Sequence, residues 1–257
     1  MPSSNSISSS SSSSNITPIF LTFVLGFALL VIYYLFVRRQ KQRSTVLLVG
    51  PSGSGKTTLF LQLRDGSAHL GTVASMQENE ADIAVLSSKA KPLGSLHLVD
   101  VPGHPRLTHT LERYLATASA VIFVLDSTDV SPHRSEAAEA LFEVLAHPQI
   151  TRRRTKVLVL CNKSDLELQA HSVEFVIRTL EKQLEAMRRT RATLAAAGDS
   201  AALRESNIKE LPNAVPDKPF SFAAIKGQVF FAAVSSTKGG ASIDPVQEFI
   251  RAQMLGN

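Results

Sequence analysis

Residues 44–57 read STVLLVGPSGSGKT, an apolar run that leads directly into a glycine-rich loop. The run from Ser44 to Val49 is aliphatic and β-branched, which is typical of a buried strand in a parallel sheet. The loop has the spacing GxxxxGKT, and a helical-looking stretch from Thr58 to Arg64 follows it. Strand, loop and helix in this order predict a phosphate-binding loop.

Each residue type in this loop has a physical role in holding phosphate. Glycines let the backbone turn its N–H groups inward, and the start of the following helix adds positive potential. The lysine is expected to bridge the β- and γ-phosphates, and the threonine after it to bind Mg2+. The predicted phosphate-binding residues are Gly50, Pro51, Ser52, Gly53, Ser54, Gly55, Lys56, Thr57 and Thr58. The loop alone does not distinguish ATP from GTP.

A carboxylate follows a second apolar run. The run Leu96–Val99 ends at the motif DVPGH, residues 100–104. We expect the Asp100 carboxylate to point toward Mg2+ and the backbone N–H of Gly103 to meet the γ-phosphate. DxxG is a weak motif by itself, and it gains its meaning from its place after the phosphate-binding loop.

The motif NKSD, residues 162–165, indicates guanine as the base. It follows the predicted strand Lys156–Leu160. The Asp165 carboxylate can accept both N–H groups of the guanine edge, which adenine lacks, and the stem of Lys163 can cover the base. With adenine in the site, Asp165 would be buried without a hydrogen-bond donor, at a cost of about 1–3 kcal/mol. The same acid that favours GTP therefore disfavours ATP. The alternative is that Asn162 opens an ordinary turn or helix cap.

The N-terminal part of the chain predicts a membrane anchor. Residues 1–17 form a serine-rich tail expected to be disordered. Residues 18–37 are the expected transmembrane helix, because the uncharged stretch from Ile19 to Val37 would reach about 28 Å as a helix. Residues 38–44 form a basic flank, which places the following domain in the cytosol by the positive-inside rule. A signal peptide and a buried core helix were the competing interpretations.

Composition excludes several other classes of protein. The net charge of +5 comes with basic residues gathered beside the apolar segment, not interleaved with aromatic residues, so direct nucleic-acid binding is not expected. The single cysteine, Cys161, excludes an intrachain disulfide, and its apolar neighbours predict an inert core thiol.

The remaining segments continue an alternation of strands and helices. This alternation predicts the α/β class, with a doubly wound, mostly parallel sheet in one domain over residues 45–257. The expected elements are a strand at Ala120–Asp126, a helix at Ser135–His147, a helix over 170–197, an inserted loop over 198–219 and a closing helix at Ile243–Leu255. Arg188, Arg189 and Arg191 are expected on a solvated, charged end of the second helix.

The order of the motifs resembles that of the Ras-like small GTPases, which are P-loop proteins. SSTK, after the predicted strand Val229–Val234, resembles their SAK element and would place Ser236, Thr237 and Lys238 at the guanine base. The N-terminal anchor makes the chain similar to the family of signal recognition particle receptor beta subunits, near the Arf and Sar groups.

This resemblance implies a function. It implies binding of GTP or GDP with Mg2+, on a single-pass endoplasmic reticulum protein with a lumenal N-terminus. It further implies a heterodimer with the receptor alpha subunit, contact with the membrane, and the ribosome or translocon as further partners in co-translational targeting.

The resemblance also assigns the switch residues. Thr72, with Ser75 as the alternative, would bind Mg2+ together with Thr57 and Asp100. His104 stands where Ras-like enzymes place a water-orienting glutamine, and it is the predicted catalytic residue. No arginine finger is evident in the sequence, so we expect hydrolysis to be slow and timed by a partner.

Four alternative functions stay open at this point. They are an Arf- or Sar-like trafficking GTPase, a scaffold that keeps GTP permanently bound, a P-loop ATPase or kinase, and a translation-type GTPase suggested by DxPGH.

Overall fold

A computed structural model describes residues 25–31, 44–67, 77–87, 91–103, 108–197, 211–212, 218–238 and 240–255. The chain divides into two units, Met1–Arg43 and Ser44–Asn257. Residues 25–31 are helical and exposed, and the rest of the predicted span 18–37 lies outside the described residues. Among the helices that are described, none combines the length and the apolar character needed to cross a bilayer.

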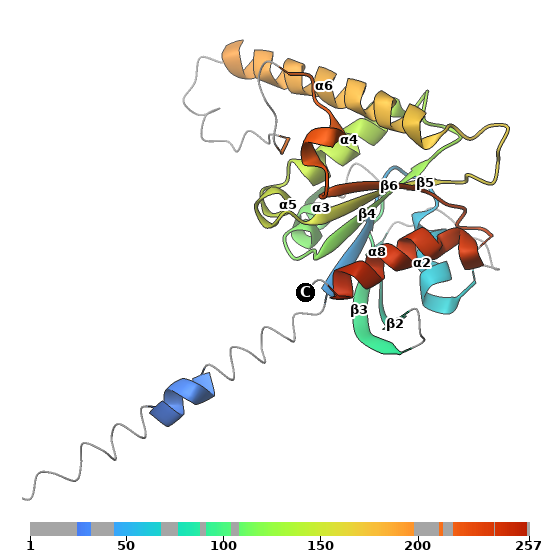
Figure 1. Cartoon of the computed structure of the whole chain (residues 1–257). Coiled ribbons are helices and arrows are strands. Elements are labelled where there is room, and N and C mark those ends of the chain that lie inside the picture. The colour runs from blue at the N-terminus through green and yellow to red at the C-terminus, as the bar shows by residue number, and fades with distance from the viewer. Residues whose placement is uncertain are drawn as a thin grey trace, which may run out of the picture. The chain divides into compact units, whose positions relative to one another are not determined.

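A six-stranded sheet forms the centre of the second unit (Figure 1). The strand order is β2-β3-β1-β4-β5-β6, with β2 antiparallel to β3 and the other neighbours parallel. The strands are β1 (Ser44–Val49), β2 (Asn79–Leu86), β3 (Pro92–Asp100), β4 (Ala120–Asp126), β5 (Lys156–Asn162) and β6 (Val229–Ala233). The prediction of a mostly parallel α/β sheet is confirmed.

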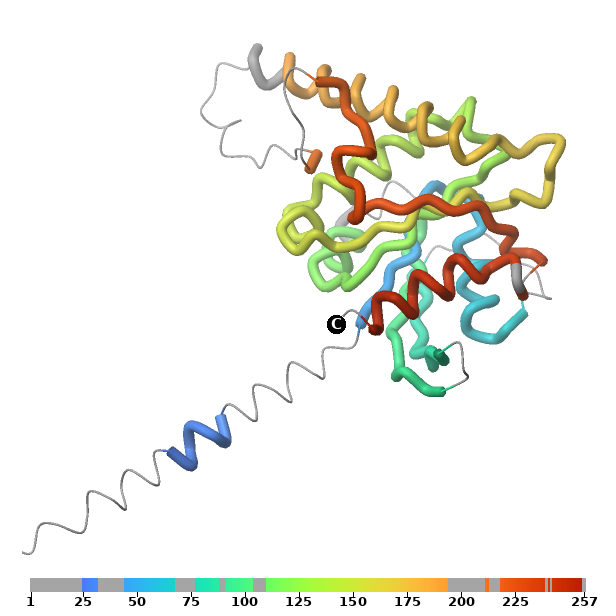
Figure 2. The backbone as a smooth tube through the Cα atoms, in the orientation of Figure 1, coloured from blue at the N-terminus to red at the C-terminus, as the bar shows by residue number. Residues whose placement is uncertain are grey.

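Helices cover both faces of this sheet (Figures 1 and 2). In β4, Val121 and Phe123 pack into one apolar cluster, whereas Ala120 and Ile122 pack into the other. Apolar residues on both faces explain why the central strands appear in the sequence as continuous apolar runs. The described helices are α2 (Lys56–Asp65), α3 (Thr108–Leu115), α4 (Arg134–Leu145), α5 (Pro148–Arg153), α6 (Val173–Ala197) and α8 (Asp244–Leu255), with the 3-10 turns η2 (Phe222–Ile225) and η3 (Gly240–Ile243).

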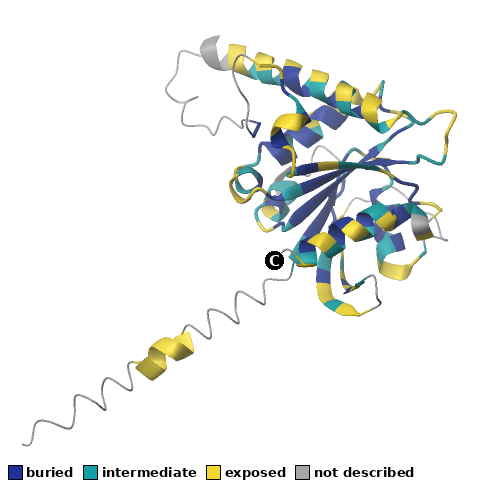
Figure 3. Ribbon diagram, in the orientation of Figure 1, coloured by how far each residue is buried: buried dark blue, intermediate teal, exposed yellow. Residues whose placement is uncertain are grey.

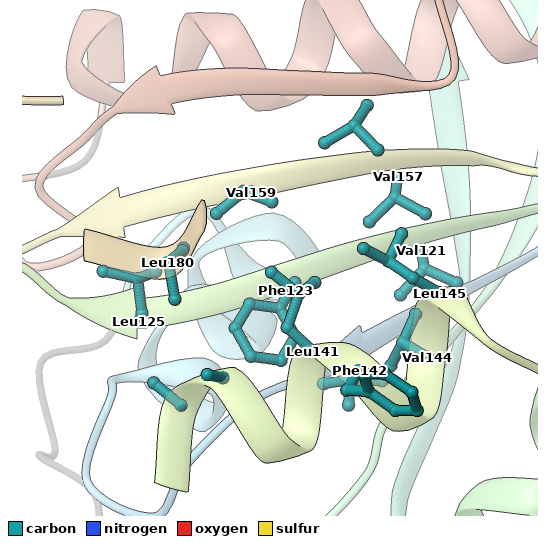
Figure 4. Packing of buried hydrophobic residues seen from close by; sticks show 14 of the residues in the cluster. Val121, Phe123, Leu125, Leu141, Phe142, Val144, Leu145, Val157, Val159 and Leu180 are labelled. Carbon is teal, nitrogen blue, oxygen red and sulfur yellow. The ribbon is translucent and has the colours of Figure 1, made fainter. Parts of the chain in front are cut away.

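The larger cluster holds α4 and α6 against the sheet. Phe123 of β4 lies beside Leu141 and Phe142 of α4, and Leu180 of α6 closes the same core (Figure 4). All four side chains are almost completely buried. This packing fixes β4, whose carboxyl end leads toward the site described below.

Helix α4 agrees with the predicted helix Ser135–His147 to within two residues, and the short helix α5 that follows it was not predicted. Helix α4 ends at Leu145, and the backbone of His147 is extended, with φ −67° and ψ 128°. Pro148 then occupies the first turn of α5, where a missing N–H is tolerated. The residue before a proline avoids the helical region, and this local rule explains the break.

Helix α6 holds the segment that returns the chain to β6. Glu181 accepts hydrogen bonds from the Ser221 hydroxyl and the Phe222 N–H at 2.8 and 2.7 Å. Glu185 is buried and accepts one from the Phe220 N–H at 2.9 Å, while Arg188 pairs with it at 2.9 Å. These bonds lower the pKa of Glu185 from 4.5 to about 2.

The outer surface of α6 carries exposed and half-buried residues over its described length (Figure 3). The three arginines expected at its solvated end are engaged in contacts with the domain itself. Arg188 and Arg189 pair with Glu185, and Arg191 pairs with Glu143 at 3.2 Å. Most of the predicted inserted loop, 198–219, lies outside the described residues.

Parallel pairing brings the motif-bearing ends of the strands to one edge. Leu48 of β1 pairs with Asp100 of β3, and Asp126 of β4 pairs with Asn162 of β5. The loop 50–57, the motif DVPGH and the motif NKSD therefore all start at the carboxyl edge of the sheet. Open α/β sheets bind their ligands at this edge.

Candidate nucleotide-binding site

The loop after β1 depends on its glycines. Gly50, Gly53 and Gly55 have φ angles of 147°, 77° and 89°, a region that other residues rarely adopt. A Cβ on Gly50 would lie 2.0 Å from the carbonyl oxygen of Val124, so the loop also packs directly on β4. The loop is therefore held in a conformation that few other sequences could adopt.

Lys56 begins α2 and folds back over the loop. Its ammonium donates to the carbonyl oxygen of Pro51 at 2.7 Å. The side chain is buried, and desolvation lowers the pKa of Lys56 from 10.5 to about 8, although the carboxylates of Asp100 and Glu136 oppose this shift. A phosphate placed in the loop would restore the preference for the charged lysine.

Thr57 and Asp100, the two described residues predicted to bind Mg2+, are in direct contact. The Thr57 hydroxyl donates to Oδ2 of Asp100 at 2.7 Å, and the Asn79 amide donates to the same oxygen at 3.0 Å. Asp100 is fully buried, and its Oδ1 has no hydrogen-bond partner within the described residues. A buried carboxylate oxygen without a partner is costly, and coordination of a cation would satisfy it. A hydroxyl beside a carboxylate is an oxygen donor set that fits Mg2+.

Gly103 lies against the phosphate-binding loop. A Cβ at this position would come within 2.4 Å of the Gly50 carbonyl oxygen and 2.7 Å of the Ser52 nitrogen. Only glycine permits this approach of the DVPGH backbone to the loop.

Asn162 ties together three loops that are distant in sequence. Its Nδ2 donates to the carbonyl oxygen of Ser54 at 2.8 Å and to the hydroxyl of Ser236 at 3.0 Å. Its Oδ1 accepts from the backbone N–H of Ser236 at 3.0 Å. Asn162 is fully buried, and a Cβ on Gly55 would lie 2.3 Å from its Nδ2. A single amide thus connects the phosphate-binding loop with the segments expected to hold the base.

Lys163 has a left-handed backbone, with φ 62°. Its ammonium forms an ion pair with Oδ2 of Asp126 at 2.5 Å, which aligns the lysine stem beside the loop. Burial alone would raise the pKa of Asp126, but hydrogen bonds from Lys163 and Thr128 outweigh it and hold that pKa below its ordinary value. Asp165 follows two residues later and is half-buried.

The SSTK segment follows β6 at the carboxyl edge of the sheet. Ser235 and Ser236 are buried, whereas Thr237 and Lys238 are exposed. The Ser235 hydroxyl lies 3.1 Å from that of Thr237 and accepts from the Lys238 N–H at 3.4 Å. The Ser164 N–H donates to the carbonyl oxygen of Val234 at 3.1 Å, so the SSTK segment lies beside NKSD.

A cleft of about 370 Å³ borders the phosphate-binding loop. It is lined by residues 51–54, by Lys163 and Asp126, and by the start of α4. Thr57, Asp100 and Asp165 are not among the described residues that line it. The cleft therefore adjoins one side of the predicted site without containing all of it.

The structure brings most of the predicted residues to one place. Thr72, Ser75 and His104 lie outside the described residues, so their predicted roles remain predictions. Sequence reasoning missed two contributors, Asn79 and Asp126. Asp126 ends an apolar strand just as Asp100 does, and that position was a usable signal.

Comparison with known proteins identifies the family. The sequence model of the signal recognition particle receptor beta subunit matches residues 41–229. The chain belongs to this family. The resemblance predicted from motif order and the N-terminal apolar segment is confirmed.

Two relatives of this beta subunit family illustrate the match. The beta subunit of Rattus norvegicus is 32% identical over 220 residues, covering 84% of this chain and 77% of the relative. A chain of the mammalian SRP receptor structure is 28% identical, with a TM-score of 0.67 over 81% of this chain and 99% of the other.

A third comparison concerns the structure of a complex. The SRb-GTP/SRX complex from Chaetomium thermophilum gives a TM-score of 0.59 at 23% identity, over 81% of this chain and 97% of the matched one. At this identity the likeness shows the fold.

Replacing Asn162 tests the connection between the loops. Asn162→Ala leaves the buried carbonyl of Ser54 and the N–H of Ser236 without their partner, so we expect the free energy of unfolding to fall by about 2–4 kcal/mol. Urea unfolding followed by circular dichroism would measure this loss. Gln169→Ala removes an exposed amide and serves as the control. Equal stability of the two variants would contradict the role assigned to Asn162.

Proposed function

We propose that this chain is a guanine-nucleotide-binding subunit that holds a partner at a membrane. The observation that carries the proposal is the junction made by Asn162, which links the phosphate-binding loop to NKSD and SSTK. A phosphate cradle and a base-recognition segment joined by one buried amide have the arrangement that a single bound nucleotide requires.

Guanine selectivity is assigned to the base side of this site. Asp165 would accept the two N–H groups of the guanine edge, and the stem of Lys163, aligned by Asp126, would cover the base. The backbone N–H of Thr237 would contact the base, while those of Ser236 and Lys238 hold this segment in place through Asn162 and Ser235. The family membership and the GTP named in the Chaetomium complex support guanine over adenine.

Mg2+ would be held by Thr57 and Asp100, with Thr72 as a further ligand. The ion would supply charge neutralisation at the β- and γ-phosphates. Lys56 would hold the same phosphates through its ammonium, and Gly103 would present its N–H to the γ-phosphate. We further propose that His104 orients the attacking water in a slow hydrolysis that a partner accelerates.

The cellular role follows from the family. We assign the chain to the endoplasmic reticulum membrane, with residues 18–37 as a single span and the nucleotide domain in the cytosol. There it would hold the receptor alpha subunit for co-translational targeting, near the ribosome or translocon. The partner SRX in the Chaetomium complex supports a heterodimer.

Exchanging Asp165 for asparagine tests base recognition. Asp165→Asn replaces an acceptor with an amide that no longer matches two donors, so we expect GTP affinity to fall by at least about 100-fold. Xanthosine triphosphate carries a carbonyl where guanine has its amino group, so its affinity should rise. Isothermal titration calorimetry with GTP and with xanthosine triphosphate measures both affinities.

Glu167→Gln is the matched control for this variant, because it removes a nearby exposed carboxylate. It should bind GTP as the unmodified chain does. Undiminished GTP binding by Asp165→Asn would rule out this acid as the base-recognition group.

The pKa of Lys56 predicts a pH dependence of nucleotide binding. The free chain loses the lysine proton around pH 8, whereas bound phosphates favour the protonated form and raise this pKa. Affinity for GDP should therefore decline above pH 8, approaching tenfold per pH unit. Lys56→Arg stays protonated over this range and should show a flat profile between about pH 8 and 9, below the pH at which the guanine ring itself loses a proton. If the affinity for GDP fell with pH equally in the unmodified chain and in Lys56→Arg, Lys56 would not be the group that causes the pH dependence.

The partner's affinity tests whether nucleotide state matters. A switch must bind its partner more tightly in one state, so we expect the alpha subunit to bind the GTP form at least about tenfold more tightly than the GDP form. The full chain in nanodiscs, titrated with the alpha subunit, gives both constants. Equal affinities would instead make this a scaffold with GTP as a structural cofactor.

A further inference from the structure

Exposed cations gather at the end of the sheet opposite the candidate site. Three consecutive arginines close α5 and lead into β5, and single lysines precede β6 and β3. We call this group the basic edge: Arg152, Arg153, Arg154, Lys226 and Lys91, all of them exposed.

Backbone hydrogen bonds hold the main part of the basic edge together. The Thr155 N–H donates to the carbonyl oxygen of Ile150 at 3.0 Å, which folds the end of α5 back on itself. The Val157 N–H donates to the carbonyl oxygen of Gln228 at 2.8 Å, which places the three arginines beside the start of β6. The arginines and Lys226 therefore belong to one surface built from rigid elements.

Strand register places this surface at the end where the chain enters the domain. Val46 of β1 pairs with Ala120 of β4, and Ala120 pairs with Lys156 of β5. Ser44, which starts β1, therefore lies at the same end of the sheet as α5, which directly precedes β5. Lys91 precedes β3, which runs parallel to β1, and so it belongs to this end too.

We propose that the basic edge contacts anionic lipid headgroups of the membrane that anchors the chain. The inference rests on the proposed anchor at residues 18–37. Residues 38–43 join that segment to Ser44, and a chain of this length reaches at most about 25 Å. The end of the sheet that holds Ser44 must therefore stay near the bilayer, whatever the path of the linker.

Electrostatics favours lipid as the occupant. A cation near an anionic membrane surface strengthens binding by about fivefold, and the effect fades within about 10 Å of the surface. The basic edge adds folded cations to the basic flank already predicted beside the membrane. Docking by this edge would direct the opposite, carboxyl edge of the sheet, with its nucleotide loops, away from the bilayer and toward soluble partners.

Hydrogen–deuterium exchange of the full chain in nanodiscs tests the proposal. We expect amides of residues 148–156 and 224–229 to exchange several-fold more slowly in discs containing phosphatidylserine than in discs of phosphatidylcholine alone. High salt should remove the difference. Arg152→Glu with Arg153→Glu should abolish it, whereas Arg178→Glu with Lys182→Glu, an equal charge change on exposed positions of α6, should not.

The outcomes separate this proposal from the proposed function. A chain that inserts into discs but exchanges equally in both lipids overturns the basic edge as a lipid contact. A chain that does not insert into the discs refutes the proposed anchor at residues 18–37. The proposed lipid contact of the basic edge, which depends on that anchor, would then be refuted as well. Protection of the same residues by ribosomes in phosphatidylcholine discs, without any effect of phosphatidylserine, would assign this surface to the ribosome and overturn the proposal.

Discussion

The candidate site depends on one buried amide. Asn162 forms hydrogen bonds with the Ser54 carbonyl in the phosphate-binding loop and with the hydroxyl and backbone N–H of Ser236. One side chain thus joins three loops. Without this amide, the phosphate-binding loop and the segments expected to hold the base would lose these shared hydrogen bonds, and each would leave the edge of the sheet as a separate loop. Its burial makes each of these bonds costly to break, because water cannot replace the lost partner.

The sheet supports this junction through its register. β1 and β3 end at nearly the same level, and β4 and β5 end level with each other three residues beyond Phe123, which pairs with Val49, so Asp100, Asp126 and Asn162 all lie at the carboxyl edge. Apolar clusters on both faces hold the strands in that register. The opposite edge, where the chain enters the sheet, carries Ser44 and the arginines of α5, so the candidate site and the start of the domain lie at opposite ends of one sheet.

Much of this could be predicted from local sequence. Buried parallel strands are continuous apolar runs, so β1, β4 and β5 were located to within about two residues, which is the usual uncertainty of element ends. Motif spacing also predicted that the loop 50–57 and Asp100 lie at the same edge of the sheet, as the strand register shows. The end of α4 before Pro148 was also predicted, whereas the short helix α5 that begins at Pro148 was not.

Tertiary partners could not be predicted in the same way. The ion pair of Lys163 with Asp126 and the bond from Asn79 to Asp100 join segments far apart in the chain, and no local pattern encodes such contacts. The same holds for the bonds from Asn162 to Ser54 and Ser236.

The most direct test of the central claim is to identify the nucleotide that the protein carries. The full chain, purified in Mg2+-containing buffer and then denatured, should release GTP or GDP in near-stoichiometric amount on ion-exchange chromatography. Recovery of adenine nucleotides, or failure of the folded chain to take up added guanine nucleotide at micromolar concentration, would contradict the account.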